Sequence, residues 1–295
     1  MPSLTIREVL AGATAEISQA GIDLPRLDAE VILAGILRKS RTDLLIDCQQ
    51  VIPDLHLYQF SRAIARRVAG EPVAYITGEK EFMSLSFKVD RNVLIPRPET
   101  EIVVEEALAI KPLCVIDVGT GSGAIAVSIA HYARDVQVTA IDISAGALEV
   151  AKNNAIRHGV AERIFFLRGN LVEPLDSPGV YGRFDAITAN LPYIPSSEMD
   201  NLPVSVRQYE PFTALDGGQD GLQYYRNLCP PALNLLKEGG MLLLEIGYTQ
   251  AGVLMDFLAG LGYSDIHVIS DLAGLDRVIK ARKPAEQIKL GKPRI

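Results

Sequence analysis

The stretch Asp117-Val118-Gly119-Thr120-Gly121-Ser122-Gly123 decides the fold. It follows the apolar run 113–118 and precedes a segment with helical periodicity, so a strand is expected to end at a glycine-rich turn that opens a helix. Glycines let the backbone approach a ligand closely, and the helix N-terminus presents free N–H groups. Asp142 ends the next predicted strand, where a carboxylate can accept hydrogen bonds from ribose hydroxyls. Together these features predict a site for a nucleoside-containing cofactor.

Strands and helices alternate on from this turn. Helical patterns follow the glycine-rich turn as far as residue 131 and recur at 145–158 and 222–236, and apolar runs predict seven strands, at 113–118, 136–143, 163–167, 184–189, 241–246, 263–269 and 277–281. This alternation indicates an α/β protein whose mostly parallel sheet is covered on both faces. Gly119, Gly121 and Ala124 also satisfy the dinucleotide-binding pattern, so the turn by itself does not choose between NAD and S-adenosylmethionine.

The first 70 or so residues predict a small helical bundle. Apolar residues recur at helical spacing over 4–17, 27–37 and 55–68, and Gly21 is expected to end the first helix. From Val73 the pattern favours strands, with Thr77-Gly78 as the turn of a β-hairpin. Pro98 then suits the first turn of a new helix. The predicted domains are a helical docking domain at 1–72, a hairpin linker at 73–95 and a catalytic domain at 96–295.

Composition narrows the class of protein. The 295 residues contain 36 acids and 29 bases, a formal charge of -7, so the basic excess expected of a nucleic-acid-binding surface is missing. Cys48, Cys114 and Cys229 form no paired motif, which fits a reducing compartment. The first residues lack the features of a signal peptide, and the most apolar window, 113–133, contains an aspartate and three glycines. We therefore expect a soluble cytoplasmic protein without a membrane span.

The fourth strand runs directly into Asn190-Leu191-Pro192-Tyr193. Ligands of open α/β sheets bind beyond the carboxyl ends of the strands, so Asn190 is expected beside the glycine-rich turn. Its side chain can both accept and donate hydrogen bonds, while Pro192 stiffens the turn and Tyr193 offers a flat surface for a planar group. The tetrapeptide therefore predicts a site for a planar NH2 group facing the cofactor.

These motifs resemble the HemK/PrmC family of N5-glutamine methyltransferases, which modify class 1 peptide chain release factors. The resemblance covers nearly the whole chain and includes the segments GEPVAYITG at 70–78, IPRPETE at 95–101, DVGTGSGAIA at 117–126, DIS at 142–144, NLPY at 190–193, YEP at 209–211, EIG at 245–247 and DLAGLDR at 271–277. It implies a Rossmann-like, class I S-adenosylmethionine-dependent methyltransferase sheet, with an N-terminal helical bundle joined by a β-hairpin. The implied reaction methylates the glutamine of the GGQ motif, produces S-adenosylhomocysteine and supports translation termination.

The resemblance also implies residue roles. The catalytic set is Asn190, Leu191, Pro192 and Tyr193, in which the asparagine side chain and the next carbonyl hold the substrate carboxamide. The family has Asn-Pro-Pro-Tyr here, whereas this chain has Leu191 in place of the first proline. Leucine keeps the carbonyl but frees φ and adds an N–H, so we expect a less preorganised loop with retained activity.

The expected cofactor-binding residues lie at the ends of neighbouring strands. Asp117 is expected to order the glycine-rich turn through its own hydrogen bonds, and Asn170 either contacts the adenine or forms an Asx-turn. The full predicted set is Asp117, Gly119, Thr120, Gly121, Ser122, Gly123, Asp142, Asn170, Leu171 and Asn190. The spacing of the four histidines is unlike that of metal ligands, so no metal is expected.

Three other functions remain open at this point. An adenine-N6 methyltransferase acting on DNA or RNA would use a related tetrapeptide, but it should carry a positive face. A dinucleotide-dependent oxidoreductase leaves NLPY without a role, and a non-catalytic binding module would have its loop disabled by Leu191. The expected partner is a class 1 release factor docked by the N-terminal bundle, with the enzyme a monomer and no nucleic acid bound directly.

Overall fold

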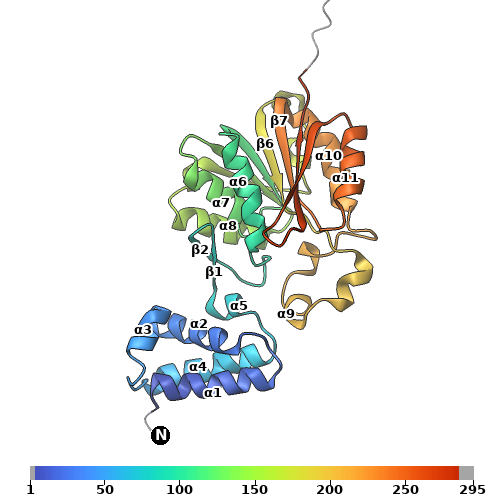
Figure 1. Ribbon diagram of the computed structural model, residues 1–295. Helices are drawn as coiled ribbons and strands as arrows, with labels where there is room; N and C mark the ends of the chain where they lie inside the picture. The colour runs from blue at the N-terminus through green and yellow to red at the C-terminus, as the bar shows by residue number, and fades with distance from the viewer. Residues whose placement is uncertain (1–3, 286–295) are drawn as a thin grey trace, which may run out of the picture. The chain divides into compact units, whose positions relative to one another are not determined.

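The computed structural model describes residues 4–285, which fall into two compact units (Figure 1). Unit 1 comprises the chain up to Lys80 together with 89–91 and 202–210, and unit 2 comprises 81–88, 92–201 and the chain from Pro211 onward. Segment 202–210 therefore packs with the N-terminal residues, although it is far from them in the sequence. No helix among residues 4–285 is both long enough and apolar enough to cross a membrane.

Unit 1 is a small bundle of helices. Its helices are α1 (Ile6–Gln19), α2 (Pro25–Leu37), α3 (Arg41–Ile46), α4 (Asp54–Val68), α5 (Val73–Thr77) and α9 (Val204–Arg207). A capping box between Thr5 and Glu8 starts α1, and the left-handed Gly21 follows its end, as expected from the sequence. The residues that α1 buries recur at helical spacing, which explains why the sequence predicts this bundle.

The short helix α5 corrects the strand predicted from Val73 onward. The N–H groups of Tyr75 and Ile76 both donate to the Pro72 carbonyl, at 3.0 and 3.1 Å, so the chain turns helically after the proline. Ile76 then packs against the apolar core of the bundle. Gly78, at a φ of +77°, ends this helix instead of forming the hairpin turn.

The hairpin itself lies a few residues further on. It consists of β1 (Glu79–Phe82) and β2 (Leu85–Lys88), which form a separate two-stranded sheet. Met83 and Ser84 connect them at φ values of +49° and +57°, the conformation of a tight two-residue hairpin loop. Glu101 supports this turn, because its Oε1 accepts a hydrogen bond from the Met83 N–H at 2.6 Å.

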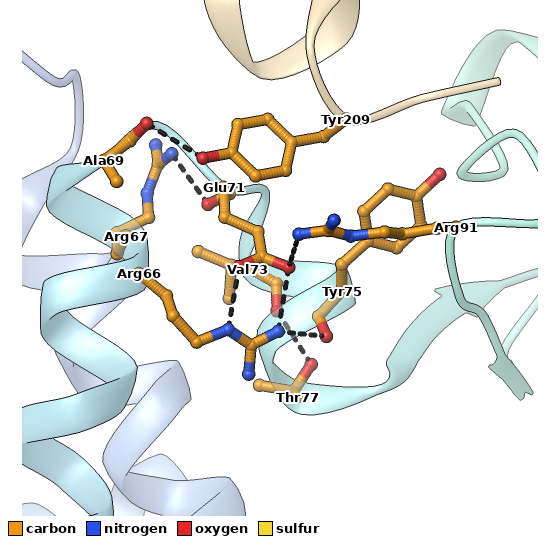
Figure 2. A network of polar contacts seen from close by, with 9 residues as sticks. All are labelled: Arg66, Arg67, Ala69, Glu71, Val73, Tyr75, Thr77, Arg91 and Tyr209. Atoms are coloured by element: carbon orange, nitrogen blue, oxygen red, sulfur yellow. Dashed lines mark hydrogen bonds and ion pairs between the residues drawn. The ribbon is translucent and has the colours of Figure 1, made fainter.

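A buried carboxylate organises the end of the bundle (Figure 2). Arg66 donates from Nε and Nη2 to the two oxygens of Glu71, at 2.7 and 2.8 Å, and Arg91 donates to the same carboxylate at 3.2 Å. The hydrogen bonds from Arg66 hold the pKa of Glu71 below its ordinary value. The Tyr209 hydroxyl donates to the Ala69 carbonyl at 3.0 Å, so segment 202–210 is attached to unit 1 by a specific contact.

Unit 2 is built on a seven-stranded sheet of order β5-β4-β3-β6-β7-β9-β8. The pairs among the first five strands are parallel, whereas β9 runs antiparallel to both of its neighbours. The strands are β3 (Cys114–Val118), β4 (Gln137–Asp142), β5 (Ile164–Arg168), β6 (Phe184–Ala189), β7 (Leu236–Glu245), β8 (Ser264–Ser270) and β9 (Asp276–Arg282). All seven predicted strands are thereby confirmed, and β7 begins earlier than expected, at Leu236.

Helices cover both faces of this sheet (Figure 1). On one face pack α6 (Glu101–Ala109), α7 (Ala124–Tyr132) and α8 (Ala145–Arg157), and on the other α10 (Gln223–Leu235) and α11 (Ala251–Gly260). Short 3₁₀ helices η1 to η6 occupy Pro98–Thr100, Ala161–Arg163, Glu173–Leu175, Pro178–Val180, Ser196–Asn201 and Phe212–Ala214. The expected α/β architecture, with a mostly parallel sheet between two helical layers, is confirmed.

Candidate active site

The glycine-rich turn between β3 and α7 has a backbone that requires glycine. Gly119, Gly121 and Gly123 have φ values of +71°, +55° and +79°, a region that other residues rarely adopt. A Cβ on Gly123 would lie 3.1 Å from the Ala151 side chain of α8, so the helices could not pack as closely. The turn thus brings backbone N–H groups to the N-terminus of α7, where an anion or a polar ligand is stabilised.

Asp117 orders this turn through hydrogen bonds of its side chain, as the sequence predicts. Its carboxylate is fully buried and accepts hydrogen bonds from the hydroxyls of Thr120, at 2.7 Å, and Thr188, at 3.0 Å. Burial raises the pKa of Asp117 to about 6, against the opposing effect of these hydrogen bonds. Because the carboxylate faces the loop, Asp117 acts on the conformation of the turn.

Asp142 lies at the end of β4, beside the turn. Its Oδ2 accepts a hydrogen bond from the Gly121 N–H at 2.8 Å, and its Oδ1 accepts one from the Ser144 N–H at 2.9 Å. Burial raises the pKa of this carboxyl above its ordinary value. Each carboxylate oxygen has a second lone pair, so Asp142 can accept further hydrogen bonds from a ligand seated on the turn.

The remaining predicted cofactor residues differ in their placement. The side chains of Thr120 and Ser122 are buried, so a ligand would meet their backbone rather than their hydroxyls. Asn170 is exposed after β5, and its amide donates to Glu173 Oε1 at 2.8 Å within a turn. Leu171 follows it at a φ of +50°. Both lie close to Asp142 in the fold, because the Gly169 N–H donates to the Asp142 carbonyl at 3.1 Å.

The NLPY segment lies directly beside the glycine-rich turn. Strands β3 and β6 are parallel neighbours, with Val118 opposite Ala189, so the two loops leave the sheet at the same edge. A Cβ added to Gly119 would lie 3.1 Å from Leu191 Cδ2 and 3.6 Å from the Asn190 carbonyl oxygen. The structure therefore brings together the two segments that the sequence singles out.

Asn190 has a fixed side-chain contact. Its Nδ2 donates to the Thr100 hydroxyl at 3.1 Å, and Thr100 is itself buried at the start of α6. With the amide nitrogen held in this way, Oδ1 is the group of Asn190 that remains to accept hydrogen bonds. The next residue, Leu191, is buried in the apolar core of unit 2, and this burial anchors the loop.

The rest of the NLPY segment packs tightly against residues 217–221, a later part of the chain that contains several glycines. The Gln250 amide donates to the Tyr193 carbonyl at 2.8 Å. A Cβ on Gly221 would lie 2.2 Å from that same carbonyl oxygen, and one on Gly217 would lie 2.7 Å from the Pro192 carbonyl. The long stretch 191–220 is therefore closed at its base, which fixes the backbone of the tetrapeptide.

Four further residues contact the site without having been assigned a role from the sequence. Thr100 bonds Asn190, Gln250 bonds Tyr193, and the Tyr193 hydroxyl lies 3.4 Å from Glu245 Oε1. Arg277, paired with Asp271 at 2.9 Å, adds a positive charge near that carboxyl. Thr100, Glu245 and Arg277 belong to segments that carry the family resemblance, and that resemblance is the sequence signal by which their place at the site could have been predicted.

These features fit a nucleoside-containing cofactor. The turn has three glycines in the left-handed region, so no Cβ at these positions stands between its backbone and a ligand. Asp142 supplies a carboxylate at the end of the adjacent strand, where it can bind hydroxyls. Asn190 borders the same turn, so a substrate amide would meet the cofactor there.

Comparison with known proteins agrees with this geometry. A methyltransferase domain model matches residues 115–208. A methyltransferase from Pyrococcus furiosus shares the fold, with a TM-score of 0.52 and 19% identity over 76% of this chain and 99% of that chain. Fold and site together define a class I, S-adenosylmethionine-dependent methyltransferase.

The N-terminal unit identifies the family more narrowly. Residues 8–78 match the PrmC N-terminal domain. The chain is 43% identical to a release factor glutamine methyltransferase from Moorella thermoacetica, over 96% of this chain and 100% of that protein. It is 39% identical to the enzyme of that name from Geobacter sulfurreducens, over 94% and 96%. The chain belongs to the release factor glutamine methyltransferase family.

Proposed function

We propose that this enzyme methylates the side-chain nitrogen N5 of the glutamine in the GGQ motif of class 1 peptide chain release factors. The observation that carries the proposal is the Asn190 amide, held by Thr100 beside the glycine-rich turn. The near full-length similarity to proteins named for this activity supports the choice of substrate. S-adenosylhomocysteine is the product that follows from the proposed reaction.

The chemistry depends on orienting a weak nucleophile. An amide nitrogen is weakly nucleophilic because its lone pair is delocalised into the carbonyl. Asn190 Oδ1 and the Leu191 carbonyl are two acceptors that can take both hydrogens of the substrate NH2 group and aim its nitrogen. Orientation of this kind can lower a barrier by about 7–11 kcal/mol in well-aligned systems.

The cofactor has a distinct set of residues. Asp142 would bind the ribose hydroxyls, and the backbone of the glycine-rich turn would face the remainder of the molecule. When bound, S-adenosylmethionine supplies an electrophilic methyl group on a sulfonium sulfur. A dedicated strong base is not required of the protein, because the amide proton can leave after methylation.

The direct test is a parallel labelling experiment. The enzyme is incubated with methyl-labelled S-adenosylmethionine and, in separate reactions, a class 1 release factor, DNA and tRNA. We expect label in the release factor, and we expect it to disappear when the GGQ glutamine is replaced. Label in a nucleic acid without label in the release factor would favour an adenine-N6 methyltransferase and reject the proposal.

The leucine that replaces the family proline is expected to have a modest effect. Replacing Leu191 with proline should change kcat by less than about tenfold, since either residue supplies the acceptor carbonyl. The proline restricts the backbone but also removes the buried leucine side chain, and these two effects oppose one another. Steady-state kinetics on a release factor measure this effect. A gain of many orders of magnitude would mean that the natural chain is nearly inactive.

We also propose that unit 1 docks the release factor while unit 2 performs the transfer. Adding a release factor should slow amide hydrogen exchange in α1 to α4, whereas the cofactor without a release factor should not. The full chain is needed because Tyr209 and the rest of 202–210 pack with unit 1, and deletion of the N-terminal residues would expose them. Protection confined to unit 2 would reject this division of roles.

A further inference from the structure

A buried carboxyl lies behind the NLPY segment. Glu245, the last residue of β7, is 1% exposed. Its Oε1 is 3.4 Å from the Tyr193 hydroxyl, and the Thr100 hydroxyl acts as a hydrogen-bond donor that lowers the pKa of the same carboxyl. Within residues 4–285, Oε2 has no hydrogen-bond partner. A buried carboxyl that is incompletely paired is costly for stability, so its presence beside the site calls for a functional explanation.

Thr100 connects this carboxyl to Asn190. Asn190 Nδ2 donates to Thr100 Oγ1 at 3.1 Å, so the hydroxyl acts as an acceptor on that side. A hydroxyl has one hydrogen, and Glu245 is the acceptor toward which Thr100 can direct it. A carboxylate only accepts hydrogen bonds. Glu245 therefore sets the direction of both hydrogen bonds, the one from Thr100 to Glu245 and the one from Asn190 to Thr100.

The direction of this chain determines which end of the Asn190 amide faces the substrate. With Nδ2 directed toward Thr100, Oδ1 is presented to an incoming NH2 group as an acceptor. If the Thr100 hydroxyl were free to donate to Asn190 instead, the amide could turn over and offer its own NH2 group. Two NH2 groups facing one another cannot form the hydrogen bond that the reaction needs.

We propose that Glu245, acting through Thr100, is a positioning residue that fixes the Asn190 side chain with its oxygen toward the substrate amide. This inference rests on the proposed function and adds to it a pair of residues without direct contact with the reacting atoms. Glu245 and Thr100 come from β7 and from the start of α6, so three segments of the fold converge on one amide orientation.

The charges around Glu245 make this arrangement sensitive to pH. Burial raises the pKa of Glu245 to about 7; the charge of Glu99 raises it further and that of Arg277 lowers it. The Tyr193 and Tyr225 hydroxyls also face this residue, the latter donating to the Glu245 carbonyl at 2.6 Å. The protonated carboxyl can donate a hydrogen bond to Thr100 and so reverse the direction of the hydrogen bonds that lead to Asn190, whereas the carboxylate cannot. We therefore expect kcat to rise about tenfold between pH 6 and pH 8.

The test compares Thr100→Val with Thr100→Ser in the full-length enzyme. Valine has the shape of threonine without the hydroxyl, whereas serine keeps it. We expect the valine variant to lose about tenfold or more in kcat, and the serine variant to stay within about threefold of wild type. The Kd for S-adenosylmethionine should change by less than about twofold in both variants, because Thr100 does not belong to the glycine-rich turn.

The pH profile supplies a readout that a purely structural role would not change. Glu245→Gln cannot ionise, so the rise in kcat between pH 6 and pH 8 should be absent from this variant. A valine variant as active as the serine variant, or a glutamine variant that keeps the wild-type pH dependence, would overturn the inference. If the wild-type enzyme fails to methylate the release factor at all, the proposed function falls first and this inference with it.

Discussion

Replacing Asn190 with alanine should lower kcat on a release factor by about 10²–10³-fold. The substitution removes the Oδ1 acceptor and leaves one of the two groups that would orient the substrate NH2. Asn190 borders the glycine-rich turn but is held from the other side by Thr100, so the loss should fall on the chemical step. Single-turnover kinetics with saturating cofactor measure it, and isothermal titration should find the Kd of S-adenosylmethionine within a few-fold of wild type.

The matched control is Asn153→Ala on α8. Asn153 is exposed and in the same unit, so its replacement tests for a general effect of losing an asparagine amide. We expect wild-type kinetics from this variant. An Asn190→Ala enzyme that turns over at the wild-type rate would show that the tetrapeptide does not bind the reacting amide, and the proposed mechanism would fail.

Replacing Asp142 with alanine should weaken binding of S-adenosylmethionine by about 10²–10³-fold. Hydrogen bonds to a charged group contribute about 1.5–3 kcal/mol each, so losing two ribose contacts costs about 3–6 kcal/mol, and the lower part of this range corresponds to the expected loss of affinity. The substitution also removes the acceptor of the Gly121 and Ser144 N–H groups, which loosens the turn before any ligand arrives. Titration calorimetry or equilibrium dialysis with the cofactor measures the change.

Asp135→Ala provides the control for this second variant. Asp135 is exposed and precedes β4, so it lies at the opposite end of the same strand from Asp142. Its loss should leave the cofactor Kd unchanged within error. Wild-type affinity in Asp142→Ala would contradict the assignment of this carboxylate to the ribose.

The sheet was predictable because each of its strands is marked by residues that are adjacent in the sequence. A strand in a parallel sheet is buried on both faces, so β3 and β6 appear in the sequence as mostly apolar runs, each interrupted by an aspartate. Helix α11 was not predicted, since it is apolar on most of its surface and contains two glycines, which obscures a helical period. Segment 73–77 was misassigned because a β-branched apolar run favours a strand until Pro72 and Gly78 set the ends of a helix.

The site was predictable only in part, for a different reason. Asn190 and the glycine-rich turn follow neighbouring parallel strands, and the rule that ligands bind at strand ends brings them together. The bond from Asn190 to Thr100 joins residues 90 positions apart, and no sequence period encodes such a contact. Glu245 was likewise visible only as part of a family motif, because its role depends on a hydrogen-bond chain through another element.

The placement of segment 202–210 has a consequence for engineering. The chain leaves the NLPY loop, contributes this segment to unit 1, where Tyr209 bonds Ala69, and then returns to the sheet. A chimera that exchanged only the amino-terminal helices with those of a relative would place Tyr209 against a different protein's backbone in place of the Ala69 carbonyl. Exchange of recognition modules between such enzymes should therefore transplant both pieces of chain at once.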